Sequence, residues 1–179
     1  RYQSVFARER GAVAAPTANL HFTNKILKKA KKKGVNVVPV LLHIGLGTFR
    51  PVRVEDLSRH EMDSEYYRLS EESAETINET VDKGGRVVAV GTTVVRVLET
   101  VVKTDGHVKP EEGWTDKFIY PPYKFKVVNA LLTNFHQPAS TLFLLVCAIG
   151  GRELILKAYK HAIKEEYRFY SYGDAMLIK

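Results

Sequence analysis

The sequence predicts an α/β fold, either one α/β domain or part of an α/β barrel, in which mostly parallel strands alternate with helices. Two observations support this prediction. Strand-like runs alternate along the chain with turns and segments of helical periodicity, and the runs over 35–44 and 86–90 are apolar almost throughout. Strands of a parallel sheet are buried on both faces, so they lack the polar alternation of a half-exposed strand.

The first half of the chain contains this pattern twice. Thr23 is a suitable N-cap for a helix that ends at Gly34, and the strand over 35–44 follows. Pro39 lies within that strand and indicates a bulge or an edge, because proline has no N–H to donate. A strand over 65–69, a helix from the Ser70 cap to Gly84, a strand over 86–90 and a helix over 94–103 complete this half.

The second half is less regular. Residues 104–115 contain Gly106, Pro110 and Gly113, which predicts a surface loop. A short strand is expected over 118–120, while periodicity alone leaves the type of the apolar segment over 127–135 undecided. Ser140 caps an apolar helix to residue 149, a further helix covers 152–166, and a strand follows Asp174. With no repeat or linker, we expect a single domain over 1–179.

Composition and motifs exclude several classes of function. The chain has 27 Lys and Arg against 20 Asp and Glu, a net charge of +7, and six of the lysines lie between residues 25 and 33. Lys28, Lys29 and Lys32 in this run form either a solvated helix end or a phosphate-binding surface. One Cys and no His pair at i, i+4 argue against a zinc site and any other metal site, and no P-loop motif is present. No apolar run is long enough to cross a membrane. A single Cys fits a reducing compartment, so we expect a cytoplasmic protein.

Four polar loops follow predicted strands, where α/β folds bind their ligands. In the first, two glycines let the backbone approach a ligand, hydroxyl and guanidinium groups can bind oxygen, and a phenylalanine offers a stacking face. A tight turn without function explains the same segment equally well. The loop begins at His43 and contains Gly45, Gly47, Thr48, Phe49 and Arg50.

The second and third loops both precede predicted helices. Gly91, Thr92 and Thr93 start a helix whose free N–H groups can bind an anion, and Arg96 lies one turn further on. Thr93 could instead be a simple N-cap. The third loop, over 133–141, is the densest polar cluster of the chain, although its histidine could be structural. Its candidate site residues are Asn134, Phe135, His136, Ser140 and Thr141.

The fourth loop, over 167–174, alternates aromatic residues with Arg168 and ends at Asp174. The alternative for this loop is a packed C-terminal edge with exposed tyrosines. Cys147 lies within an apolar helix and is expected to be a core residue.

Five stretches closely resemble the S-adenosylmethionine:tRNA ribosyltransferase-isomerases of queuosine biosynthesis. They are AVAAPTANLHFT (12–23), LLHIGLGTFRPV (41–52), VGTTVVRVLET (90–100), FIYPPYKFKVVNALLTNFHQPASTL (118–142) and YRFYSYGDAML (167–177), in family order. The resemblance implies that the chain is the C-terminal part of such an enzyme. It also implies a place in a large α/β (TIM-like) barrel domain, without the inserted small β-barrel domain and the N-terminal segment.

The resemblance also implies a reaction. The ribosyl group of S-adenosylmethionine, a co-substrate rather than a bound cofactor, is transferred to 7-aminomethyl-7-deazaguanine in tRNA and isomerised to epoxyqueuosine, with release of adenine and methionine. We expect His43 or His136 to transfer protons, and Asp174 to replace or orient one of them. Phe49 and Phe135 would stack on bases, the helix start at Gly91 with Arg96 would bind the methionyl carboxylate, and Arg168 with the lysine run would contact tRNA.

Two other classes of function remain: a non-catalytic tRNA-binding module or inert fragment, and a small-molecule enzyme without a nucleic-acid partner. A monomer is expected in each case. The chain departs from the family pattern at a few positions, of which Pro122 and Asn129 are the most unusual because proline restricts the backbone and asparagine removes a charge.

Overall fold

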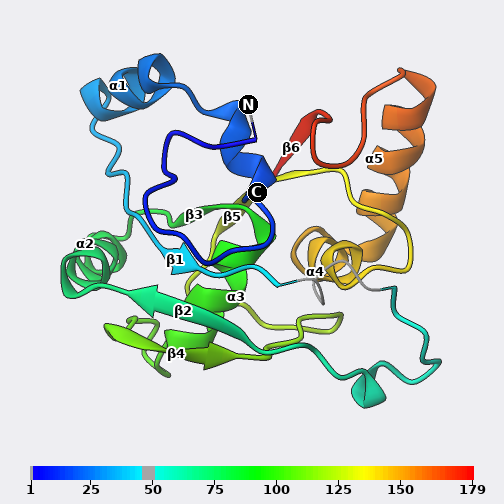
Figure 1. Ribbon diagram of the computed structural model, residues 1–179, viewed down its shortest axis with the longest axis horizontal. Coiled ribbons are helices and arrows are strands. Elements are labelled where there is room, and N and C mark those ends of the chain that lie inside the picture. The colour runs from blue at the N-terminus through cyan, green and yellow to red at the C-terminus, as the bar shows by residue number, and fades with distance from the viewer. Residues whose placement is uncertain (1, 46–50) are drawn as a thin grey trace.

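The computed structural model describes residues 2–45 and 51–179 (Figure 1). Two stretches of the chain, 24–42 and 65–178, contain nearly all of its regular structure. In chain order the elements are η1 (Thr17–His21), α1 (Asn24–Lys32), β1 (Leu41–Leu42), η3 (Leu57–Arg59), β2 (Glu65–Leu69), α2 (Glu71–Asp82), β3 (Val88–Val90), α3 (Thr92–Val101), β4 (Glu111–Thr115), β5 (Ala130–Asn134), α4 (Thr141–Gly150), α5 (Arg152–Lys164) and β6 (Ala175–Ile178).

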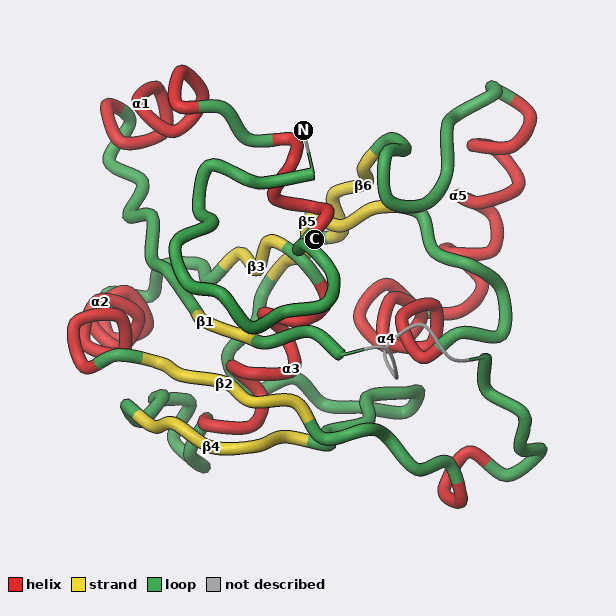
Figure 2. Tube along the Cα trace, in the orientation of Figure 1, coloured by secondary structure: helices red, strands yellow, loops and turns green. Residues whose placement is uncertain are grey.

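The strands form two separate three-stranded sheets (Figure 2). The first has the order β1-β2-β4 and is antiparallel throughout, with Tyr67 of β2 opposite both Leu42 and Gly113. The second has the order β3-β5-β6, in which β3 and β5 are parallel and β6 is antiparallel to β5. The prediction of a TIM-like barrel with mostly parallel strands is therefore wrong: the described strands close no barrel, and β3–β5 is their one parallel pair.

Two local errors explain this outcome. The strand predicted over 35–44 shrinks to Leu41–Leu42, because Pro39 interrupts it and Val35 is 52% exposed. Residues 111–115, predicted to be a loop, form strand β4, which pairs with β2 over five positions. The charged residues and Gly113 of this segment are unusual for a strand, so the sequence does not predict one. An antiparallel strand tolerates them because one face of its sheet can be exposed to solvent. No strand forms over 118–120.

The helix starts are predicted well. The hydroxyl of Thr23 accepts a hydrogen bond from Ile26 N at 3.3 Å, and Ser140 caps α4 by accepting one from Phe143 N at 3.1 Å. Ser70 caps α2 in the same way. Each hydroxyl satisfies a backbone N–H that has no partner within the helix, so the sequence signal and the physical cause coincide.

The core lies where α3 and α4 pack against β5. Val95, Val97, Leu131 and Val146 have no solvent exposure. The departure from the family pattern at Asn129 is accommodated, since its amide oxygen accepts a hydrogen bond from Val87 N at 2.7 Å, as a carboxylate could. This packing holds the carboxyl ends of β3 and β5 side by side.

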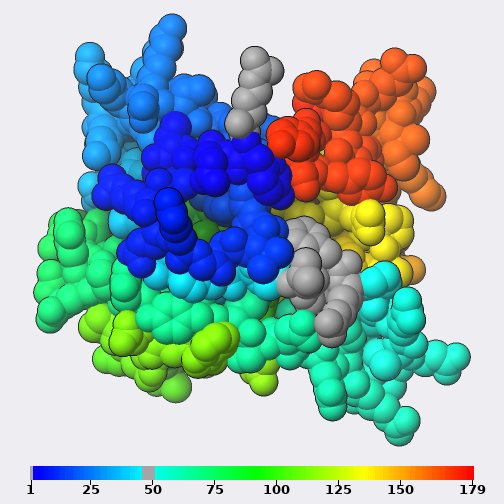
Figure 3. Space-filling view, in the orientation of Figure 1, coloured from blue at the N-terminus to red at the C-terminus, as the bar shows by residue number. Residues whose placement is uncertain are grey.

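The N-terminal segment lies on the surface beside the C-terminal one. Figure 3 shows the dark blue residues spread over the front of the molecule and bordering the red ones. The rings of Tyr2 and Tyr172 are 5.6 Å apart between centroids, and Thr17 of η1 reaches the end of β5. The two ends of the described chain therefore meet next to β5 and β6.

Candidate active site

A pocket of about 250 Å³ lies at the carboxyl ends of the parallel strands β3 and β5. This is the position at which α/β sheets commonly bind ligands. Segments from five parts of the chain form its wall. The lining residues are Ala15, Pro16, Thr17, Ala18, Ile44, Gly91, Thr92, Thr93, Thr133, Asn134, Phe135, His136, Gln137, Ser140, Leu142, Tyr170 and Ser171.

Asn134 joins three of these segments. Its Oδ1 accepts a hydrogen bond from Thr17 Oγ1 at 3.0 Å, and its Nδ2 donates to Gly173 O at 3.4 Å and to His21 Nε2 at 3.2 Å. The carbonyl of Gly173 requires the amide NH₂ on that side, which fixes the orientation of the side chain. Asn134 is 2% exposed, and these hydrogen bonds connect the walls of the pocket.

His136 lies in the pocket wall with two hydrogen bonds. Its Nε2 is 2.8 Å from Thr133 Oγ1, and its backbone N–H donates to the hydroxyl of Tyr159 on α5 at 2.9 Å. Burial lowers the pKa of His136 to about 4, so the imidazole is neutral at neutral pH. A neutral imidazole is able to accept a proton from a ligand in the pocket.

The start of α3 forms another part of the wall. Gly91 has φ +99°, a conformation that disfavours residues with a side chain, and its N–H donates to Leu132 O at 2.9 Å. This turn places Thr92 and Thr93 at the pocket. Free N–H groups and hydroxyls at a helix N-terminus are suited to bind a carboxylate or a phosphate.

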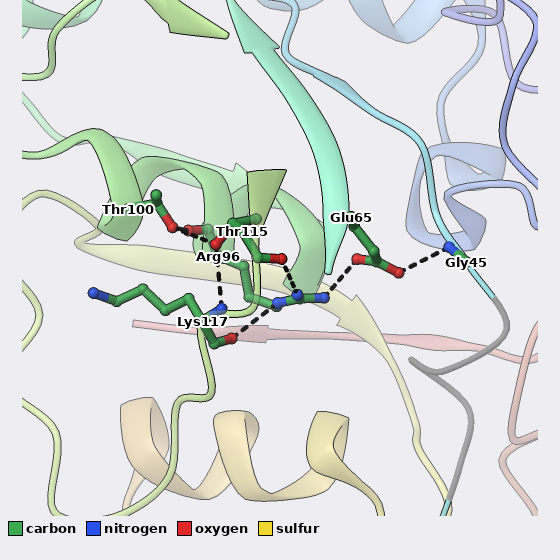
Figure 4. A network of polar contacts seen from close by, with 6 residues as sticks. All are labelled: Gly45, Glu65, Arg96, Thr100, Thr115 and Lys117. Atoms are coloured by element: carbon green, nitrogen blue, oxygen red, sulfur yellow. Dashed lines mark hydrogen bonds and ion pairs between the residues drawn. The ribbon is translucent and has the colours of Figure 1, made fainter. Parts of the chain in front are cut away.

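Arg96, expected to assist in binding a carboxylate, is not among the residues that line the pocket. Figure 4 shows it in a network of polar contacts with residues of β2 and β4. Its Nη1 is 2.6 Å from Glu65 Oε2, and both side chains are almost completely buried. Its remaining nitrogens donate to the carbonyls of Thr115 and Lys117. The other oxygen of Glu65 accepts a hydrogen bond from Gly45 N at 2.8 Å. The guanidinium therefore ties α3 to the antiparallel sheet, and Gly45 belongs to the same network.

His43 also lies away from the pocket. The neighbouring Ile44 lines it, whereas the His43 ring faces Gly11 of the N-terminal segment and the ring of Tyr66. A Cβ at Gly11 would lie 2.5 Å from the imidazole, so only glycine permits this approach. The Nε2 atom of His43 is buried and has no hydrogen-bond partner among the described residues. The structure thus separates the two histidines expected to transfer protons.

Of the other predicted site residues, some pack in the interior and some lie at the pocket. Phe135 is 4% exposed, with its ring stacked on Phe169 at 4.9 Å between centroids. Ser140 lines the pocket while it caps α4, and the adjacent Thr141 is buried outside the lining. Asp174 accepts a hydrogen bond from Arg168 N at 2.8 Å, which lowers the pKa of the carboxyl group.

Four candidates, Gly47, Thr48, Phe49 and Arg50, lie outside the described residues. Within the described part of the chain, no group of three or more His, Cys, Asp or Glu side chains could hold a metal ion. No helix over residues 2–45 or 51–179 is long and apolar enough to cross a membrane.

Lys28, Lys29 and Lys32 are exposed on α1, which has no buried residue.

Sequence reasoning missed several residues at the pocket. Thr17 and His21 contact Asn134 from more than 100 positions earlier in the chain, and Tyr159 contacts His136 from a separate helix. Tyr170 and Ser171 complete the rim. Tyr170 and Ser171 lie within the fourth polar loop that the sequence predicted, although neither was named there as a site residue. For Thr17 and His21 the only signal was that 12–23 is one of the stretches that carry the family resemblance, and Tyr159 had none.

The pocket and its strands define a class: an α/β domain with a ligand site at the carboxyl ends of its parallel strands. The chain belongs to the queuosine biosynthesis protein family, whose model matches residues 1–178. It is 59% identical over all 179 residues to the S-adenosylmethionine:tRNA ribosyltransferase-isomerases of Acetivibrio thermocellus and Natranaerobius thermophilus. These 179 residues correspond to 52% of each relative, so the chain spans about half of their length.

A solved structure supports the same assignment. The crystal structure of S-adenosylmethionine tRNA ribosyltransferase from Thermotoga maritima matches with a TM-score of 0.74 and 44% identity. The match covers 90% of this chain and 51% of that one.

Proposed function

We propose that this chain forms part of an S-adenosylmethionine:tRNA ribosyltransferase-isomerase. The pocket at the ends of β3 and β5 carries the proposal, because it combines a neutral histidine with an anion-binding helix start in a chain of this family. The reaction transfers the ribosyl group of S-adenosylmethionine to 7-aminomethyl-7-deazaguanine in tRNA and isomerises it to epoxyqueuosine.

His136 is the proposed base. The reaction requires removal of a proton from the ribose carbon next to the sulfonium, whose positive charge acidifies that proton. Of the two candidate histidines, His136 lines the pocket and His43 does not. Thr133 orients the imidazole through Nε2, and among the described residues no hydrogen bond reaches Nδ1, which leaves that nitrogen for the substrate.

The helix start at Gly91 is the proposed site for the methionyl carboxylate. Thr92 and Thr93 supply hydroxyls there, and the first N–H groups of α3 supply donors. Arg96 is not part of this proposal, because its guanidinium is paired with Glu65 and lies outside the pocket lining. Asp174 is a weaker candidate for proton transfer, because it holds Arg168 N and lies outside the pocket lining.

The proposed partner is tRNA, with Lys28, Lys29, Lys32 and Arg168 as its phosphate contacts. All four side chains are exposed, and α1 carries no acidic residue. S-adenosylmethionine is the co-substrate, with no resident cofactor, and the protein is proposed to act as a cytoplasmic monomer.

The test is adenine release from S-adenosylmethionine with modified tRNA, measured on the whole native polypeptide that contains this chain. His136→Gln should reduce turnover by about 10²- to 10⁴-fold, the range for loss of a general base. His161→Gln is the matched control, since His161 is exposed on α5, and it should stay within about twofold of wild type. Near-normal turnover of His136→Gln in a folded protein removes His136 from the mechanism.

A non-catalytic tRNA-binding module is the second candidate, favoured by the lysines of α1. Salt-dependent retention of tRNA without any release of adenine would identify it. Absence of tRNA binding even at low salt would instead indicate an enzyme acting on small molecules.

A further inference from the structure

Three exposed tyrosines lie in the loop that follows α5. Tyr167, Tyr170 and Tyr172 are 48%, 51% and 66% exposed, and we name residues 167–174 the tyrosine loop. Single exposed aromatic residues are common on protein surfaces, but three within six positions form a patch. Tyr170 and Ser171 of this loop line the rim of the pocket. The patch therefore adjoins the proposed active site.

Hydrogen bonds hold the tyrosine loop in one shape. Arg168 N donates to the carboxylate of Asp174 at 2.8 Å, and Asp174 N donates back to Arg168 O at 2.7 Å, which closes the loop. Tyr170 N donates to Phe135 O at 3.0 Å and attaches the loop to the end of β5. A Cβ at Gly173 would lie 2.3 Å from Arg168 O, so the closure requires glycine there. The tyrosines are thus displayed on a preorganised support.

Tyr170 adopts a conformation that favours glycine. Its φ is +69°, in the left-handed region, which is unfavourable for a residue with a bulky side chain. A residue without a side chain would relieve this strain, so the aromatic ring is present at an energetic disadvantage. Strain of this kind concentrates at binding sites, and here it occurs on the pocket rim.

The exposed rings suit unpaired bases. Phe135 and Phe169 are stacked on each other, and Phe135 has little accessible surface left for a ligand. The tyrosines keep about half or more of their surface exposed, although the ring of Tyr167 also has an edge contact with Phe135 at 6.0 Å between centroids. Every base can stack on an aromatic ring. The chain up to the end of this loop carries a small positive excess, which favours a polyanion, since residues 157–174 contain four Lys and Arg against three Asp and Glu. The side chain of Arg168 is 77% exposed within the loop itself.

We propose that the tyrosine loop is a stacking surface for the unpaired tRNA bases that flank the target nucleotide. This proposal rests on the proposed function for the identity of the RNA. The pocket receives the reacting groups, and Tyr167 and Tyr172 hold neighbouring bases of the anticodon loop beside it. Tyr172 also packs against Tyr2, so the N-terminal segment borders the same surface.

The kinetic experiment uses the whole native polypeptide with modified tRNA and S-adenosylmethionine. Tyr172→Ala should raise the KM for tRNA about 5- to 100-fold, the range for loss of one base stack, while the KM for S-adenosylmethionine stays at its wild-type value. Tyr172→Phe should restore the KM for tRNA to within about threefold, because the ring is retained. Trp114→Ala is the matched control, as it removes an aromatic side chain that is 69% exposed on β4 in the other sheet.

A fluorescence experiment tests stacking directly. An anticodon stem-loop RNA carrying 2-aminopurine next to the target position should lose fluorescence on binding the wild type, because stacking quenches this base. The quenching should be lost in Tyr172→Ala or Tyr167→Ala and kept in the phenylalanine variants. Equal quenching in all variants, or an unchanged KM for tRNA in Tyr172→Ala, would overturn the proposal.

Other outcomes separate the two proposals. If Tyr172→Phe is as defective as Tyr172→Ala, the hydroxyl matters and stacking is refuted. If sedimentation shows a dimer that Tyr172→Ala dissociates, the patch is a contact between two copies and the RNA assignment is refuted. If the wild type quenches 2-aminopurine but releases no adenine, the stacking surface stands and the proposed enzymatic function fails.

Discussion

The two sheets of this protein have the same number of strands but different roles. The antiparallel sheet β1-β2-β4 is joined to α3 by a buried ion pair between Glu65 of β2 and Arg96, away from the pocket. The sheet β3-β5-β6 contains the parallel pair, whose carboxyl ends place Thr92, Thr93 and His136 around one pocket. The comparison shows that strand direction decides where polar loops meet: parallel neighbours end at the same edge, whereas antiparallel neighbours end at opposite edges.

The largest expected effect concerns the ion pair. Arg96→Met leaves Glu65 as a buried carboxylate without its guanidinium, which should lower the free energy of unfolding by about 3 to 5 kcal/mol. Urea denaturation at pH 7 measures this change. Adding Glu65→Leu to Arg96→Met should recover much of the loss, because the double variant buries no charge at these two positions. A loss below about 1 kcal/mol for the single variant would show that this sheet does not depend on the pair.

The second prediction concerns the pH dependence of the pocket. The pKa of His136 is lowered from 6.5 to about 4, so between these pH values the unfolded chain binds a proton that the folded chain does not. Stability should therefore fall as the pH drops from 6.5 to 4, by up to about 1.4 kcal/mol per pH unit from this one group.

His136→Gln should remove this part of the slope, and thermal or urea unfolding at several pH values measures it. His161→Gln, which replaces an exposed histidine on α5, is the control for the substitution itself. An unchanged slope in His136→Gln would mean that the pocket does not desolvate the imidazole, and the contrast between the two sheets would weaken.

The smallest effect on stability is expected at α1, which belongs to neither sheet and buries no side chain. Replacing Lys28, Lys29 and Lys32 with alanine should change the unfolding free energy by less than about 0.5 kcal/mol. If these lysines contact phosphates, the slope of log K for tRNA against log salt should fall by about 2 to 3. An unchanged slope would identify α1 as a solvated helix and leave the pocket rim as the docking surface.

Helices and their caps were predictable from the sequence because they depend on neighbours in the chain. Ser140 and Thr23 accept hydrogen bonds from residues three positions further on, so their signal is local. Sheet topology was not predictable, since β2 pairs with β4 across more than 40 residues and β4 resembles a loop. Apolar runs indicate burial, but they do not indicate the direction of the neighbouring strand.

The site residues also differ in whether their signal in the sequence is local or depends on tertiary contacts. Asn134 and His136 were identified because polar groups crowd one short segment, whereas Thr17 and Tyr159 reach the pocket through tertiary contacts that no spacing reveals. Arg96 was misleading for a physical reason. A cation near a helix N-terminus opposes the helix dipole and requires a negative partner, and Glu65, 31 positions earlier in the chain, provides it.

The hydrogen bond from His136 N to the Tyr159 hydroxyl has a consequence for recombination between relatives. Helix α5 contributes no residue to the pocket lining, so replacing it with the corresponding helix of a relative would be expected to leave the pocket unchanged. The donor helix must nevertheless carry a hydroxyl at position 159, or the backbone of the histidine turn loses its acceptor. Chimaeras should therefore inherit the turn after β5 and helix α5 as one block.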